Sequence, residues 1–202
     1  HLYEEKGTDC VNFLNGMFAF AVWDVRKKVL FLARDRFGIK PLYYTSYDNN
    51  FIFASELKSI LQFPSFPKKI DINAVNQYFT FEYVPTPNTI LQDVKKLPGG
   101  HFLLYREGTI KIQKYWDIQF NKINSPSAYK EDILKYQIEQ AVKYRLVSDV
   151  PLGIFLSGGI DSSTITSFAK NISTATIKTF SLGFRELSFD ESHFFNRIAG
   201  YY

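Results

Sequence analysis

The stretch GIFLSGGIDSS, residues 153–163, leads from an apolar run into two adjacent glycines, an aspartate and three serines. The apolar run is typical of a buried strand, and a helix is predicted directly after the glycines. One face of that helix is apolar, with Ile165, Phe168, Ala169 and Ile172. A second strand, TFSLGF at residues 179–184, follows it. A strand, a helix and a further strand form a βαβ unit, which predicts the start of a parallel α/β sheet.

The residues between the first strand and the helix, here called the glycine loop (residues 157–162), have the composition of a phosphate site. At the carboxyl end of a parallel strand, the next helix points its free N–H groups and positive dipole into a crevice. Gly158 and Gly159 allow close approach of a ligand, and consecutive N–H groups can form an anion nest. Asp161 would repel a bare phosphate, so its presence indicates a divalent cation between the two.

A plainer interpretation of the glycine loop stays open at this point. No lysine follows the glycines, so the loop differs from G-x-x-x-x-G-K-[ST], and the pattern G-x-G-x-x-G is also absent. The two glycines could simply form a turn in which Asp161 and the following serines cap the next helix.

Upstream of this unit, the composition changes at residues 121–132, NKINSPSAYKED, where Asn, Ser and Pro cluster. Ser125 and Pro126 are suited to the start of a helix. That helix is predicted to have an apolar stripe of Leu134, Ile138, Ala141 and Val142. We therefore place a domain boundary between Trp116 and Ser125, with one domain at 1–120 and a second at 121–202.

The first domain is predicted to be rich in antiparallel hairpins. The paired runs are 18–24 with 28–35, 41–46 with 51–56, and 101–106 with 110–116, each across a short polar turn. Helices are expected at 56–62 and from Asp71 onward. The first pair is apolar at nearly every position, so we expect it to be covered on both faces.

The two ends are predicted to be helical. Residues 1–6, HLYEEK, resemble the last turns of a helix closed by Gly7, and a capping box from Ser188 to Glu191 should begin the final helix. Neither end has the signals that normally open or close a domain, so we expect the chain to be an internal fragment.

Composition argues against several classes of protein. With 46% hydrophobic residues, the chain is too apolar to be disordered, and its net charge of +4 comes from scattered basic residues that do not suit nucleic acid. No run reaches the ~18 apolar residues of a membrane helix, and the acidic start is unlike a signal peptide. The single cysteine, Cys10, excludes an internal disulfide and fits a reducing compartment. We expect a cytoplasmic protein without nucleic-acid or membrane partners.

Several motifs carry a family resemblance. FLSGGIDSS resembles the pyrophosphate-binding loop S-G-G-x-D-S of the ATP pyrophosphatases, and RLVSDVPLGIF with FSLGF…FDES narrows the match to the synthetase domain of the asparagine synthetases. LNGMFAFAVWD, LARDRFGIKPLYY, FASELKSIL and KLPGGHFL resemble the C-terminal part of the class II glutamine amidotransferase domain that precedes that synthetase domain.

The resemblance implies an α+β fold followed by an α/β fold. The first would be an antiparallel four-layer sandwich of the Ntn amidotransferase type, incomplete in this chain, and the second the start of a parallel-sheet nucleotide-binding domain. It implies glutamine hydrolysis and internal delivery of ammonia. ATP and Mg²⁺ then convert aspartate to an acyl-adenylate, and ammonia displaces AMP after pyrophosphate has left. Glutamine, aspartate and ATP would be the small-molecule partners, and a homodimer is compatible with the family.

The resemblance also assigns residues. Ser157, Gly158, Gly159, Asp161 and Ser162 would hold pyrophosphate, with Asp161 acting on its magnesium indirectly. Leu156 and Leu182 match positions that contact the nucleotide. The glutaminase nucleophile of the family is an N-terminal cysteine; this chain begins at His1, so no catalytic residue is expected in it and the fragment should be inactive. Cys10 is expected in a helix as a small buried hydrophobe.

Other interpretations remain. Relatives with the same two-domain plan amidate other carboxylates or close β-lactam rings, and a truncated, non-catalytic product that binds nucleotide is a third alternative. Arg34, Asp35 and Arg36 are expected to form an ion-pair network, and Met17 to fill a core rather than line an ammonia passage. His101 and His193 lack metal-ligand spacing and are expected to be structural or to face solvent.

Overall fold

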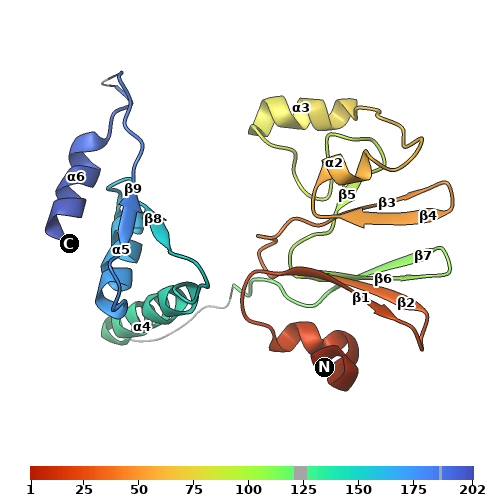
Figure 1. Ribbon diagram of the computed structural model, residues 1–202, viewed down its shortest axis with the longest axis horizontal. Helices are drawn as coiled ribbons and strands as arrows, with labels where there is room; N and C mark the ends of the chain where they lie inside the picture. Colours follow the sequence, from red (N-terminus) through yellow and green to blue (C-terminus); the bar gives the residue numbers. More distant parts are fainter. Residues whose placement is uncertain (121–126, 187) are drawn as a thin grey trace. The chain divides into compact units, whose positions relative to one another are not determined.

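The computed structural model describes residues 1–120, 127–186 and 188–202 (Figure 1). It divides into two compact units, 1–120 and 121–202, which are described separately. The helix start predicted at Ser125 and Pro126 lies outside the described residues.

The first unit contains two antiparallel sheets. One has the order β1-β2-β6-β7, and the other has the order β4-β3-β5. The strands are β1 (Ala19–Asp24), β2 (Val29–Arg34), β3 (Tyr43–Tyr47), β4 (Asn50–Ala54), β5 (Lys95–Lys96), β6 (His101–Arg106) and β7 (Thr109–Lys114). The pairs β1–β2, β3–β4 and β6–β7 are the three predicted hairpins, which are therefore confirmed.

The two sheets pack face to face. Their shared core consists of Leu32, Leu42, Leu97 and Leu103. The ring of Phe51 in β4 stacks on that of Tyr105 in β6, with centroids 4.4 Å apart and planes 15° from parallel. Such ring pairs add to the stability that burial alone provides, so this contact helps to fix one sheet over the other.

Helical segments cover the outer faces, which gives four layers (Figure 1). On the first sheet lie α1 (Leu2–Lys6) and the 3-10 helix η1 (Gly7–Phe13), whose Cys10 and Val11 join the core of Phe31, Ala33 and Phe102. On the second lies α2 (Leu57–Ile60), which places Ile60 in a core cluster. α3 (Ile72–Phe81), which begins at its N-cap Asp71, lies on the same side of that sheet (Figure 1). The helices predicted at the start, after residue 56 and after Asp71 are thus confirmed.

Coverage on both faces holds for β2 but not for β1. Phe31 and Leu32 are both fully buried, because successive side chains of β2 point to η1 and to the second sheet in turn. β1 is an edge strand of its sheet, and its Trp23 is 56% exposed. The expectation for β1 was wrong because a strand's sequence does not say whether it lies at an edge.

Arg34 and Asp35 hold the turn after β2 through its backbone. The carboxylate of Asp35, 2% exposed, accepts hydrogen bonds from the N–H groups of Phe37, Ile39 and Lys40 at 2.9–3.2 Å. The guanidinium of Arg34 donates to the carbonyls of Gly38, Lys40 and Leu97 at 2.5–2.7 Å. The predicted ion-pair network is therefore wrong: polar backbone groups of a tight turn need partners, and these two side chains supply them.

The second unit contains a parallel βαβ arrangement. Its elements are α4 (Ser127–Arg145), β8 (Gly153–Phe155), α5 (Ile160–Ile172), β9 (Lys178–Phe180) and α6 (Ser192–Tyr201). β8 and β9 are parallel neighbours, with Phe155 opposite Phe180, and α5 connects them. The predicted βαβ unit is confirmed. The predicted burial of the apolar helix faces is only partly confirmed. Val142 and Ala169 are buried, but Leu134 is 57% exposed and Ile165 is 42% exposed.

Two further expectations were wrong. The capping box at Ser188 does not form: α6 begins at Ser192, and the Ser188 hydroxyl donates to Glu186 at 3.2 Å. Met17 is 49% exposed rather than core filler, because it lies in the irregular segment between the bend at Gly16 and β1. Among the helices in the described ranges, none has the length and apolar character needed to cross a membrane.

Candidate functional site

The glycine loop starts from a strand end at which both backbone groups of one residue are hydrogen-bonded. Leu156, 1% exposed, donates its N–H to the Phe180 carbonyl at 2.8 Å. Its own carbonyl accepts a hydrogen bond from the Ser181 hydroxyl at 2.6 Å. The two carboxyl ends of β8 and β9 are therefore linked where the loop begins.

Ser157, Gly159 and Ser162 form one hydrogen-bonded group. The hydroxyl oxygens of Ser157 and Ser162 lie 3.0 Å apart, and Ser162 Oγ is 3.2 Å from the Gly159 carbonyl. The Gly159 N–H donates to Ser157 Oγ at 3.3 Å. Since each hydroxyl has one proton, Ser157 donates to Ser162, which donates to Gly159. The structure thus brings these three predicted site residues together.

The two glycines differ in why they are needed. Gly158 has φ +84°, and a β-carbon there would lie 2.6 Å from Cβ of Phe194 and 2.7 Å from the N atom of Phe195. Gly159 has φ −72°, and a β-carbon would meet only Ser157 Oγ at 3.4 Å, an ordinary contact. The fold itself therefore requires a glycine at 158 but not at 159.

Capping of α5 by Asp161 or Ser162, the plainer interpretation, is not what the structure shows. The N-cap of α5 is Gly159, and no side chain caps it. The first helical bond runs from the Ser163 N–H to the Gly159 carbonyl, so the N–H groups of residues 160–162 precede the helical ladder. Within the described ranges, the exposed Asp161 carboxylate makes no hydrogen bond or ion pair. Its charge and those amides lie at the same helix start.

The remaining predicted residue, Leu182, follows β9 by two positions and is 75% exposed. It shares the carboxyl edge of the sheet with Leu156, because parallel strands end on the same side. Beside the loop, the Ser163 hydroxyl oxygen is buried with no hydrogen-bond partner among the described residues.

Sequence reasoning gave no role to Asp190, the aspartate of the FDES motif. Its carboxylate accepts from the Ser192 hydroxyl at 2.6 Å and from the N–H groups of Ser192 and Phe184 at 3.3 Å each. These bonds, the Ser192 hydroxyl first, lower the pKa of Asp190 below its ordinary value. The signal was present in the quoted motif, but the pattern does not reveal which backbone groups the aspartate binds.

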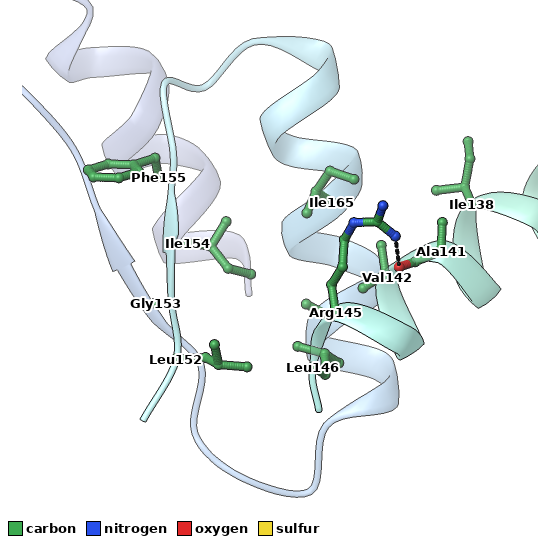
Figure 2. A pocket seen from close by; sticks show the side chains of 11 residues that line it. Ile138, Ala141, Val142, Arg145, Leu146, Leu152, Gly153, Ile154, Phe155 and Ile165 are labelled. Atoms are coloured by element: carbon green, nitrogen blue, oxygen red, sulfur yellow. Dashed lines mark hydrogen bonds between the residues drawn. The ribbon is translucent and has the colours of Figure 1, made fainter. Parts of the chain in front are cut away.

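An apolar cavity of about 440 Å³ lies elsewhere in the second unit, between α4, α5 and β8 (Figure 2). Ile138, Val142, Leu146, Leu152, Ile154 and Ile165 line it. Its one cationic side chain, Arg145, donates to the Ala141 carbonyl at 3.0 Å. None of the glycine loop residues lines this cavity, which therefore belongs to packing between the elements and not to the candidate site.

In the first unit, Cys10 is buried in η1 against the core of the first sheet, as expected. Burial raises the pKa of its thiol, which is the opposite of what a nucleophile needs. His101 Nδ1 bonds the Gly99 carbonyl oxygen at 2.7 Å, which fits the structural role expected for it. Within the described ranges, no three His, Cys, Asp or Glu side chains form a metal-ligand group.

Comparison with known proteins gives two family matches in one chain. Residues 1–116 match the glutamine amidotransferase domain family, and residues 134–202 match the asparagine synthase family. A Methanocaldococcus jannaschii protein, named among the glutamine-hydrolysing asparagine synthetases, is 39% identical over 209 residues, or 100% of this chain and 40% of that protein. Asparagine synthetase 1 of Bacillus subtilis is 40% identical over 94% of this chain and 30% of its own length.

A relative with a different name is also similar. Amidase chyE of Penicillium rubens is 35% identical over 85% of this chain and 26% of its own length. The chain spans less than half the length of each of these curated relatives. The amidotransferase match alone covers more than half of the chain, and the second match follows it in order. The chain therefore belongs to the asparagine synthetase family, with a glutamine amidotransferase segment followed by an asparagine synthase segment.

Proposed function

We propose that the protein is a glutamine-dependent asparagine synthetase, which makes asparagine from aspartate, ATP and the ammonia released from glutamine. In this proposal the glycine loop binds the pyrophosphate part of ATP together with Mg²⁺. The observation that carries it is a conjunction at one sheet edge: helical amides that precede the helical ladder, two paired serine hydroxyls and a carboxylate without a partner among the described residues.

The loop residues suit magnesium pyrophosphate. Hydroxyl and N–H donors match phosphate oxygens, and Ser157, Ser162 and the amides of residues 160–162 supply both kinds. Gly159 has no packing reason to be glycine, so close approach of a ligand to its backbone is a reason that fits. The Asp161 carboxylate, near this donor set, is the group that would face Mg²⁺, a hard cation that takes oxygen ligands.

The proposed reaction needs these groups because a carboxylate is a poor acyl donor. Bound ATP supplies the adenylyl group that turns it into a good one. The protein's part is to hold the leaving pyrophosphate as its charge develops, with donors that are already in place. Leu156 and Leu182, at the ends of β8 and β9, are proposed to contact the nucleotide.

The amidotransferase segment is proposed to supply ammonia. Its assignment rests on the family match over residues 1–116, and no described residue of the chain is proposed as its nucleophile.

The deciding experiment is exchange of labelled pyrophosphate into ATP by the complete protein. Exchange that depends on aspartate, together with asparagine formation from glutamine, is the expected result. The similarity to amidase chyE favours a second candidate, an enzyme of the same plan with another acid as acceptor. Exchange that depends on another carboxylic acid and not on aspartate would support that candidate and refute asparagine synthesis.

A further inference from the structure

We infer that Asp190 is a positioning residue for the pyrophosphate group: it fixes the first turn of α6, and this turn sets the glycine loop. The inference rests on the proposed function of that loop. It concerns a residue that touches neither the ligand nor the loop, and whose effect passes through Ser192 and Phe194.

The first step is the contact between the glycine loop and α6. The position of a Gly158 β-carbon would be 2.6 Å from Cβ and 2.7 Å from the carbonyl carbon of Phe194. The loop backbone therefore lies directly against the first turn of α6, with no flexible side chain between them. A shift of this turn must move Gly158 or open a gap beside it, because close-packed groups have no slack.

The second step is what fixes this turn. The N-cap residue of α6, Glu191, makes no side-chain cap hydrogen bond within the described ranges, and Asp190 binds the first residue of the helix instead. It binds both the hydroxyl and the N–H of Ser192, and through the N–H of Phe184 it ties the helix to the segment after β9. That segment is itself tied to the loop's starting residue, since Ser181 donates to the Leu156 carbonyl.

These contacts hold the glycine loop at two points, at its start and at Gly158. Leu156 at its start is held by Ser181, and Gly158 is in contact with Phe194 of the helix that Asp190 holds. Three donors already bind the Asp190 carboxylate, so it acts through α6 and not on the phosphate or its metal. The conformation of residues 157–159 then depends on Asp190, although Asp190 lies 31 residues after Gly159 in the sequence.

The experiment measures binding of inorganic pyrophosphate with Mg²⁺ to the complete protein by titration calorimetry. Asp190→Ala removes all three bonds, and we expect pyrophosphate to bind about 10-fold to 100-fold more weakly, because small misplacements of a binding group have large effects. Asp190→Asn keeps an acceptor for the two N–H groups and should stay within about threefold of wild type. Ser192→Ala, which loses the 2.6 Å bond, should fall between them.

Ser188→Ala is the matched control. Its hydroxyl lies two residues from Asp190 and donates to the exposed Glu186, its one hydrogen-bond partner in the described part of the chain, so the variant's affinity for pyrophosphate should equal that of wild type. Glutamine hydrolysis by each variant reports on folding of the other domain and should not change. Asp190→Ala that binds pyrophosphate like wild type overturns the inference. The inference is also overturned if Asp190→Ala, Asp190→Asn and Ser192→Ala lose pyrophosphate binding and glutaminase activity equally. Asp190 would then serve folding alone.

The inference and the proposed function fail separately. Pyrophosphate binding does not depend on the acceptor, so a protein without aspartate-dependent exchange can still show the expected order of variants. In that case the proposal of asparagine synthesis is refuted and the role of Asp190 is supported. If wild type performs the exchange and Asp190→Ala does so with unchanged KM for ATP, the proposed function stands and the inference falls. A wild-type protein that binds no pyrophosphate refutes the role of the loop and that of Asp190 together.

Discussion

Gly158 and Phe194 are in direct backbone contact, close enough that a β-carbon on the glycine would lie 2.6 Å from Cβ of the phenylalanine. Because Gly158 also has φ +84°, Gly158→Ala should combine a clash with a strained backbone. We expect a loss of at least about 2 kcal/mol in the stability of the asparagine synthase domain. Calorimetric unfolding of the complete protein checks this, and an unchanged transition would contradict the contact.

Gly159→Ala is the contrasting change. Its backbone is ordinary and the added carbon meets only Ser157 Oγ at 3.4 Å, so stability should change by no more than about 1 kcal/mol. Pyrophosphate binding should nevertheless weaken by about tenfold, because the methyl group takes the space of a ligand at the loop. Calorimetric titration with magnesium pyrophosphate measures this. Unaltered affinity would mean that the ligand does not approach residue 159.

Asp161→Asn tests the proposed metal role. We expect asparagine formation to fall by more than about 100-fold, since the neutral amide is a much weaker partner for Mg²⁺ than the carboxylate. Glutamine hydrolysis should continue at the wild-type rate, because the substitution lies in the other domain. Parallel assays of glutamate and asparagine production separate the two. Normal asparagine production by this variant would remove Asp161 from the site.

Asp35→Ala addresses the turn after β2. It removes the acceptor of three part-buried hydrogen bonds, which should cost about 3 kcal/mol of amidotransferase-domain stability. Asp35→Asn keeps one acceptor oxygen and should lose less. Asp117→Ala, which breaks an exposed ion pair with Lys114 and a hydrogen bond from the Ile118 N–H, is the control and should cost much less than Asp35→Ala. Similar transitions for Asp35→Ala and Asp117→Ala in thermal unfolding would contradict this view of the turn.

Tyr115 gives the first unit a dependence on alkaline pH. Burial, and secondarily the charge of Asp35, raises the pKa of Tyr115 to about 12. The unfolded chain loses this proton near pH 10 and the folded one only near pH 12, so stability is complete below pH 10 and falls between the two values. Tyr115→Phe should flatten that part of the stability–pH curve relative to wild type. It should also cost about 1 kcal/mol at neutral pH, through its lost bond to the Arg34 carbonyl. An equally steep decline in both proteins would assign the effect to other tyrosines.

The hairpins and the βαβ unit were predictable because their signals are local. A polar turn between two apolar runs specifies a hairpin, and the pairs β1–β2 and β6–β7 follow it. The capping box at Ser188 failed although its pattern is also local, because Asp190 binds the N–H and hydroxyl of Ser192 and starts the helix later. A local pattern identifies an element more reliably than the residue at which it begins.

The residues of the candidate site were predictable from the sequence, but the contacts that give each residue its role were not. The motif brings Ser157, Gly159 and Ser162 into one group, as the structure shows. It cannot distinguish Gly158 from Gly159, because the difference depends on α6, more than thirty residues away along the chain. The partners of Arg34 were equally hidden, since one is the backbone of Leu97.

The bonds of Arg34 and Asp35 also set an order for folding during synthesis. The hydrogen bonds of the Asp35 carboxylate reach no further than five residues, so they can form as soon as the turn has left the ribosome. The bond from Arg34 to Leu97 spans 63 residues, which at about 5–20 residues per second delays it by roughly 3 to 13 seconds. Until then the guanidinium has only its two nearby carbonyls. Asp35 therefore shapes the turn early, and Arg34 ties it late to Leu97, the residue after β5 of the second sheet.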